Sequence, residues 1–141
     1  MKIDTTASPV ILLLAALLLP ATGIAAPRDA LLATLAVAAK DADPAFSGFS
    51  AARGEKLHFT RFSGGKAQTP SCTSCHGDDP RSAGRTPAGK TIDALALSVT
   101  PTRYGDPAKV DKWFKRNCQE VLGRQCTVLE MGDWLSFMIA R

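Results

Sequence analysis

The stretch Thr69-Pro70-Ser71-Cys72-Thr73-Ser74-Cys75-His76 lies in the middle of the chain, and its last five residues form a C-x-x-C-H motif. Two thiols three residues apart can each form a thioether with one vinyl group of a porphyrin. The adjacent histidine is then held beneath the iron as an axial ligand. The motif therefore predicts one covalently bound haem c, attached through Cys72 and Cys75, with His76 as the proximal iron ligand.

A zinc site or a thioredoxin-like redox pair also uses two cysteines at this spacing. Zinc needs two further ligands at similar spacing, and the sequence contains no second C-x-x-C and no H-x-x-x-H. A thioredoxin-like pair belongs to a βαβ unit, and the chain shows no convincing strand alternation. Haem attachment is therefore the interpretation that the motif favours.

The composition sets the class of protein around this motif. The chain has 141 residues, of which 45% are apolar and 21% charged, which is typical of a globular domain and excludes wholesale disorder, collagen and a repeat array. The formal net charge of +4 falls well short of a nucleic-acid-binding footprint. We therefore expect no nucleic-acid partner.

The N-terminus has the pattern of an export signal. Lys2 precedes an apolar run over 10–19, and Pro20 and small residues follow it. The run is too short for a permanent transmembrane helix. We predict a signal peptide over 1–25, a periplasmic protein and no stable membrane span after cleavage; an uncleaved N-terminal anchor is the alternative. In an oxidising compartment spare cysteines tend to pair.

The rest of the chain predicts a mostly α-helical protein. Ser50 is a suitable N-cap, Pro107 suits the first turn of a helix, Gly123 suits a helix end, and Thr127 opens a capping-box pattern. Prolines and glycines make 61–90 an irregular loop, and a loop of that length needs something to wrap around. The expected helices cover 28–40, 51–59, 91–97, 107–122 and 128–139.

The residue on the other side of the iron separates an electron carrier from a ligand-binding protein. The candidates are Met131, Met138, His58 and Asn117. Both methionines lie on one apolar stripe of the last helix, together with Trp134 and Leu135, and this pattern favours core packing. His58 lies one helical turn after Gly54 and stays a candidate, although a lone histidine at a helix end is more often a surface or hydrogen-bonded residue.

Asn117 shares an apolar helical stripe with Val110, Trp113 and Phe114. An unpartnered amide at an inward position costs about 1–3 kcal/mol. The carboxamide therefore either forms a hydrogen bond with backbone near the helix end or binds the iron. The apolar stripe is compatible with both interpretations. The neighbouring basic residues lie off this stripe and indicate a solvated face rather than a specific docking site; they are Lys109, Lys112, Lys115 and Arg116.

From about residue 53 to the C-terminus the chain resembles the Sphaeroides haem protein family of class I c-type cytochromes. The resemblance is carried by Ser63-Gly64-Gly65-Lys66, 69–76, Gly89-Lys90, Thr100-Pro101, Val110-Asp111-Lys112-Trp113, Arg116-Asn117-Cys118 and Gly123-Arg124-Gln125-Cys126-Thr127. It implies a class I cytochrome c fold, with haem between helices and a long irregular loop. We accordingly expect an N-terminal extension over 26–49, a cytochrome c domain over 50–141, and a helix crossing near Gly54.

The resemblance also implies the distal site. In that family an asparagine occupies the sixth iron position in the ferric state and leaves on reduction, which opens a site for oxygen or nitric oxide. This role falls on Asn117, and the family's disulfide falls on Cys118 and Cys126. Such a bridge would close a loop of about nine residues, worth about 2.5 kcal/mol on chain-entropy grounds. His58 stands where an aromatic residue is expected, so a bis-histidine haem stays open.

The expected function is an exported monohaem cytochrome that transfers electrons and, when reduced, binds a diatomic ligand. The resemblance implies a redox partner that is another c-type cytochrome with two haems. The alternative is a plain electron shuttle with Met131 or His58 as a permanent ligand. Whether the chain is an enzyme stays open, because a peroxidase or oxygen reductase would need a distal acid–base group that only His58 or Arg85 could supply.

Overall fold

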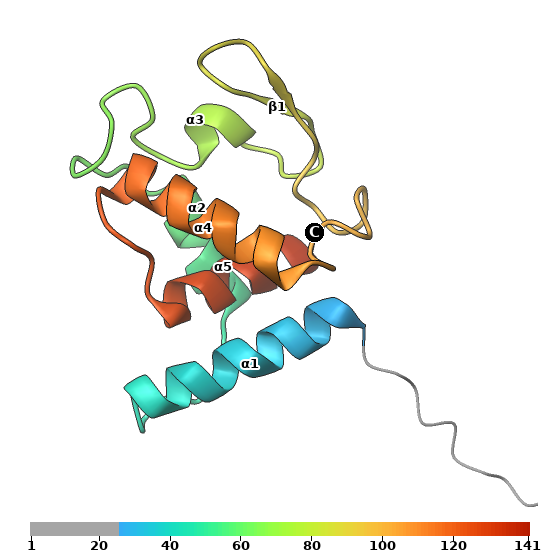
Figure 1. Ribbon diagram of the computed structural model, residues 1–141. Helices are drawn as coiled ribbons and strands as arrows, with labels where there is room; N and C mark the ends of the chain where they lie inside the picture. The colour runs from blue at the N-terminus through green and yellow to red at the C-terminus, as the bar shows by residue number, and fades with distance from the viewer. Residues whose placement is uncertain (1–25) are drawn as a thin grey trace, which may run out of the picture.

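The computed structural model describes residues 26–141 as a bundle of helices with long loops on one side (Figure 1). The predicted signal peptide over 1–25 lies outside the described residues. The elements, in chain order, are α1 (Pro27–Ala42), α2 (Ala51–Phe59), α3 (Thr73–His76), β1 (Gly84–Arg85), β2 (Thr91–Ile92), α4 (Pro107–Leu122) and α5 (Val128–Ile139).

Helices α2, α4 and α5 begin and end where the sequence predicts, and α1 runs one residue further at its start and two at its end than the predicted 28–40. The Ser50 side chain accepts a hydrogen bond from the Arg53 amide at 3.3 Å and caps α2. Gly123 ends α4 with a φ of 76°, in the left-handed region that glycine adopts without strain. At α5 the Thr127 and Glu130 side chains form the complete capping box.

Helices α2 and α5 cross at Gly54, which confirms the predicted crossing point. A Cβ atom at this position would run into the Asp133 carbonyl and lie 2.9 Å from the Trp134 Cα. The buried Asp133 carboxylate ties the two helices together. It accepts hydrogen bonds from the Ser50 amide at 2.7 Å and from the Arg53 guanidinium at 2.6 and 2.8 Å.

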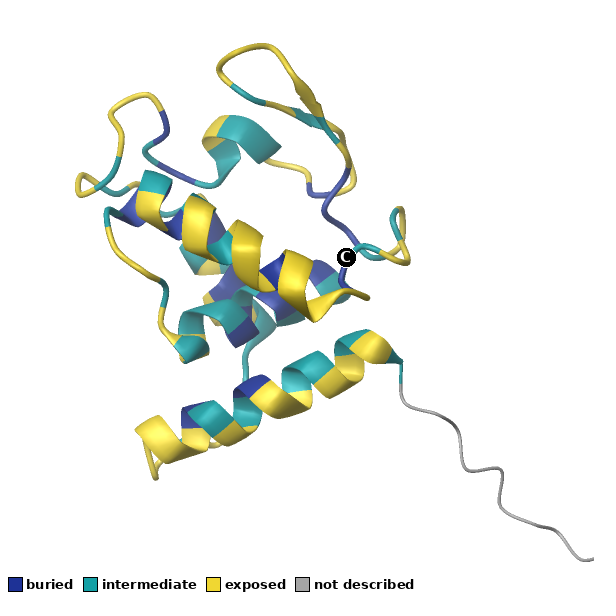
Figure 2. Ribbon diagram, viewed as in Figure 1, coloured by how far each residue is buried: buried dark blue, intermediate teal, exposed yellow. Residues whose placement is uncertain are grey.

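Helix α1 lies along the outside of the bundle and packs against α5 (Figure 1). Leu35 and Ala39 are buried against the bundle, while the opposite face of α1 is exposed (Figure 2). Just after α1, the Phe49 ring fills the space beside Gly132, where a Cβ atom would collide with it. The segment predicted as an N-terminal extension therefore contributes to the core.

The predicted helix over 91–97 is wrong. Thr91–Ile92 instead pairs antiparallel with Gly84–Arg85, and the buried residues that follow bond to distant backbone. The Leu95 and Ala96 amides both donate to the Pro80 carbonyl at 2.8 Å, and the Leu97 amide donates to Met138 at 3.1 Å. These tertiary partners satisfy the backbone groups that a helix would otherwise use.

The core is one hydrophobic cluster between the helices and the loop that precedes α4. Its buried members are Leu35, Leu95, Tyr104, Val110, Leu135, Phe137 and Met138. Within residues 26–141, none of the helices has the length and apolar character needed to cross a bilayer. The fold is mostly helical, as predicted.

Candidate functional site

The C-x-x-C-H motif forms the single turn of α3. The His76 amide donates to the Cys72 carbonyl at 3.1 Å, and the Gly77 amide closes the turn on the Thr73 carbonyl at 2.9 Å. Gly77 then leaves the helix with a φ of 70°. In a helical turn, residues three and four apart share a face. The fold therefore brings the two thiols and the imidazole together, as the motif predicts.

The two thiols are unpaired in the structure, and they are not poised as reactive thiolates. Burial raises the pKa of Cys72 to about 11, and burial also raises the pKa of Cys75. A redox-active cysteine pair needs a lowered thiol pKa. Neutral thiols within one turn instead fit thioether formation with a porphyrin.

The His76 imidazole is suited to bind a metal ion. Burial, followed by the nearby His58 and Arg103, lowers its pKa to about 4, so the ring is neutral and one nitrogen has a free lone pair. Its Nδ1 atom is buried and has no hydrogen-bond partner among the described residues. A neutral histidine next to two free thiols matches the donor set for a covalently attached haem.

Two neighbouring segments hold this turn in place. Gly84 lies directly against α3, where a Cβ atom would run into the Cys75 carbonyl and lie 2.9 Å from the His76 Cα. On the other side, the Ser71 hydroxyl bonds to the hydroxyls of Thr73 at 2.7 Å and Ser74 at 3.1 Å. The position of the histidine is thus set by packing as well as by the motif.

The segment that leads into the motif is attached to the C-terminal end of α4. The Lys66 amide donates to the Glu120 carbonyl at 2.7 Å, and its ammonium lies 2.9 Å from the Glu120 carboxylate. Side chains larger than hydrogen at Gly64, Gly65 or Gly123 would collide with backbone across this contact. The relative position of α4 and the motif is therefore fixed by close backbone packing.

Asn117 lies on α4 one turn before this contact. It is half-buried, and it follows the helical spacing of buried Val110, half-buried Phe114 and buried Val121. Among the hydrogen bonds of residues 26–141, none involves its carboxamide. The structure thus places an amide on the inward face of α4, on the helix that is attached to the motif segment.

Cys118 and Cys126 are joined by a disulfide in the structure, with their Cα atoms 5.5 Å apart. This is the pairing that the resemblance implies. The bridge links the last turn of α4 to the segment just before α5. It constrains the helix end directly after Asn117.

The other candidate ligands lie elsewhere. Met138 is fully buried in the core cluster, and Met131 packs against the same cluster, as the apolar stripe predicts. His58 is also fully buried, and its Nδ1 atom accepts a hydrogen bond from the Trp134 indole at 3.2 Å. No sequence pattern points to this hydrogen bond, because the two residues are 76 positions apart.

The prediction that Trp113 belongs to the inward stripe of α4 is wrong, because 43% of its surface is exposed. The Lys112 ammonium and the Arg116 guanidinium lie 5.9 and 5.5 Å from its ring centroid. Cations over an indole face are stabilised by the ring quadrupole. The ring therefore belongs to the basic outer face of α4 rather than to the core.

The comparisons with known proteins agree with this geometry. Residues 44–138 match the family model described as a domain of unknown function, DUF1924. The cytochrome c-type protein SHP of Cereibacter sphaeroides is 50% identical over 91 residues, which cover 64% of this chain and 70% of that protein. Cytochrome c'' of Methylophilus methylotrophus is 32% identical over 107 residues, which cover 72% of this chain and 71% of that protein.

Solved structures show the same fold. The structure of oxidised SHP, described as an oxygen-binding cytochrome c, matches with a TM-score of 0.75 and 43% identity over 84% of this chain and 100% of that chain. The crystal structure of oxidised cytochrome c'' matches with a TM-score of 0.70 and 26% identity over 80% of this chain and 93% of that chain. The chain is therefore a c-type cytochrome with the class I fold and one covalently bound haem c, and it belongs to the Sphaeroides haem protein family.

Proposed function

We propose that this protein is an exported cytochrome that transfers electrons and, when reduced, binds a diatomic ligand such as oxygen or nitric oxide. Cys72 and Cys75 attach the haem, and His76 is the proximal ligand. Asn117 holds the sixth iron position in the ferric state and vacates it on reduction. The description of SHP as an oxygen-binding cytochrome c supports this assignment.

The observation that carries the proposal is the environment of Asn117. Its carboxamide is half-buried on the inward face of α4 and is not used by hydrogen bonds within residues 26–141. Because no hydrogen bond within these residues occupies it, the carboxamide oxygen is available as a ligand. The Glu120 contacts and the Cys118–Cys126 bridge hold the end of this helix, so the amide can be kept facing the haem.

The weakness of an amide as a ligand gives the proposed site its chemistry. Haem supplies a redox-active iron whose reactivity depends on its axial ligands and on the polarity of the distal side. A neutral carboxamide binds iron less strongly than an imidazole or a thioether. Asn117 can therefore yield its place to a small ligand, whereas a permanent methionine or histidine would not.

The alternative of a plain shuttle is less well supported. Met131 and Met138 are both engaged in core packing. One nitrogen of His58 is already bonded to Trp134, and the ring lies beside the backbone of Gly77, which directly follows His76. His58 therefore lies against the segment that carries His76, which supports a role other than that of a second haem ligand.

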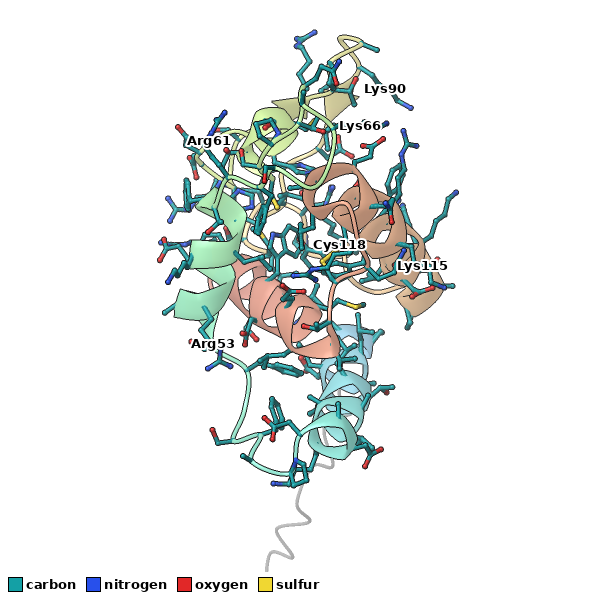
Figure 3. All side chains as sticks on the ribbon, turned by 90° about the vertical axis from the view of Figure 1, so that its left-hand side faces the viewer. Arg53, Arg61, Lys66, Lys90, Lys115 and Cys118 are labelled. Carbon is teal, nitrogen blue, oxygen red and sulfur yellow. A yellow bond between two sulfur atoms is a disulfide. The ribbon has the colours of Figure 1, made fainter. Side chains whose placement is uncertain are left out.

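We also propose that the electron partner is an acidic redox protein, such as another c-type cytochrome with two haems. Lys66, Lys112, Lys115 and Arg116 line an open cleft between the 64–66 segment and α4, together with Asp111 and Glu120. Of the four cations, Lys112 has no carboxylate partner among the described residues. Figure 3 shows Lys66, Lys90 and Lys115 on the same side of the molecule, away from Arg53 and Arg61. Exposed Trp113 adds an aromatic contact of the kind that is frequent in interfaces.

An absorption spectrum of the purified holoprotein tests the gas-binding role. The reduced protein is expected to be high-spin and to change its spectrum on addition of carbon monoxide or nitric oxide. A low-spin reduced spectrum that neither gas alters would refute the open site. Measurement of the mature N-terminus after secretion tests the proposed export separately.

A further inference from the structure

His58 is a buried polar group to which the proposed function gives no task. Its side chain is fully buried on α2, between the Phe59 ring at 5.3 Å and the Phe137 ring at 5.7 Å, measured between ring centroids. Burying an imidazole among aromatic rings is unfavourable unless its nitrogens find partners. An aromatic residue without nitrogen atoms would fill the same space at lower cost.

The hydrogen bond from Trp134 fixes the tautomer of this imidazole. An indole N–H can only donate, so the His58 Nδ1 atom that receives it at 3.2 Å carries no proton. The single ring proton therefore lies on Nε2.

The His58 ring lies near the end of the haem-attachment turn, and its Nε2–H group has no other partner within residues 26–141. This atom is buried and makes no hydrogen bond of full geometry with the described residues. The Gly77 backbone lies close enough to act on the imidazole, and Asp78 is also near. Gly77 follows His76 directly and leaves α3 with a φ of 70°, so its peptide determines how the turn ends.

We propose that His58 is a positioning residue for His76: held in one tautomer by Trp134, it presents its Nε2–H to the Gly77 carbonyl and thereby fixes the end of the turn that carries the iron ligand. Groups that orient a metal-bound histidine tune the metal as well as the ligand. His58 would thus act on the iron from the proximal side without binding it.

The Trp134 indole that bonds to His58 also contacts α4, the helix that carries Asn117. Trp134 packs edge-on against Phe114 of α4 at a centroid distance of 5.4 Å. Phe114 lies one helical turn before Asn117. Trp134 on α5 therefore contacts two other helices. Its ring packs on α4, which carries Asn117, and its N–H donates to His58 on α2.

The test compares four holoprotein variants. His58→Phe keeps an aromatic ring and removes both nitrogens, whereas His58→Gln keeps an N–H donor and an acceptor. Trp134→Phe leaves the imidazole in place and removes the N–H that selects its tautomer. Phe59→Leu is the matched control, because it alters the packing beside His58 without touching the hydrogen bonds.

The readouts are the ferric electron paramagnetic resonance spectrum and the midpoint reduction potential. We expect His58→Phe and Trp134→Phe to broaden the ferric signal and shift the potential beyond Phe59→Leu, because the His76 ring then takes several orientations. His58→Gln should restore most of the wild-type linewidth. If His58→Phe does not accumulate as holoprotein, the proposal is tested with Trp134→Phe and His58→Gln, each compared with Phe59→Leu.

Wild-type linewidths and potentials in both His58→Phe and Trp134→Phe would overturn the proposal. Equal shifts in His58→Phe and His58→Gln would also overturn it, since ring packing alone would explain them. The inference rests on His76 as the proximal ligand but not on Asn117. If the protein does not bind gases, these measurements still test the positioning role of His58, so the two proposals can fail independently.

Discussion

Replacement of Gly54 by alanine tests the helix crossing on which the site is built. In a helix interior, alanine is more favourable than glycine by about 1 kcal/mol, so propensity alone predicts a more stable protein. The crossing predicts the opposite, because the new Cβ would collide with the Asp133 carbonyl and lie 2.9 Å from the Trp134 Cα. Backbone atoms cannot rotate away as a side chain can, so α2 and α5 must separate.

Overpacking of this kind costs about 1–3 kcal/mol, and backbone obstruction places Gly54→Ala at the upper end, about 3 kcal/mol. After the propensity gain, the net loss is about 2 kcal/mol, or about 8 °C in Tm for a domain of this size. Chemical and thermal unfolding of the oxidised holoprotein, followed by far-ultraviolet circular dichroism, measures this loss.

Gly132→Ala provides the matched control for Gly54→Ala. Gly132 also lies inside a helix, but a Cβ there would meet the Phe49 ring, which is a side chain and can shift. We expect Gly132→Ala to be less destabilising than Gly54→Ala. If Gly54→Ala is as stable as the wild type, or if both variants lose the same stability, the backbone contact at Gly54 does not hold the two helices together as described.

Three further predictions follow from the charges and the disulfide. Arg124 and the Thr127 cap hold the pKa of Glu130 below its ordinary value of 4.5. The ionised Glu130 carboxylate therefore stabilises the folded protein above pH 4.5, and this contribution is lost as the pH falls through the lower pKa of the folded state. Glu130→Gln keeps a side chain that can cap but loses the exposed ion pair with Arg124, so it should cost about 0.5 kcal/mol at pH 7 in unfolding measurements and flatten the loss of stability in acid; an unchanged acid limb would contradict this. Lys109→Glu combined with Lys112→Glu should slow electron transfer from an acidic redox protein about tenfold at low salt, and at 1 M salt, where the Debye length is about 3 Å, the difference should vanish. An equal effect of Arg61→Glu on the opposite side would argue against docking at α4. Alkylation of the unfolded, unreduced holoprotein should add no label in mass spectrometry, whereas two labelled thiols would exclude the Cys118–Cys126 bridge.

Much of the fold could be predicted from local signals. The Ser50 cap, the left-handed Gly123 and the Thr127–Glu130 capping box each act within a few residues, so the sequence is sufficient to locate three helix boundaries. The C-x-x-C-H motif likewise defines its own turn. The apolar stripe of α4 is compatible with two roles for Asn117, a hydrogen bond to backbone or iron ligation. Only the family resemblance favours iron ligation.

The parts that could not be predicted depend on distant contacts. Residues 95–97 do not form the predicted helix because their amides bond to Pro80 and Met138, which lie elsewhere in the chain. Trp113 follows the apolar spacing but lies outside, since the cations of Lys112 and Arg116 flank its ring. The bond between His58 and Trp134 joins residues that are 76 positions apart, and no local pattern encodes that pairing.

Replacement of the distal carboxamide is the most direct test of the account. In Asn117→Ala, the ferric absorption and paramagnetic resonance spectra should change from those of the wild type, while the reduced spectrum and its response to carbon monoxide should stay nearly the same. Met131→Leu, which alters only core packing, should leave the ferric spectra unchanged. If the ferric spectra of Asn117→Ala match those of the wild type, or if Met131→Leu or His58→Phe abolishes the sixth ligand instead, the central claim is contradicted.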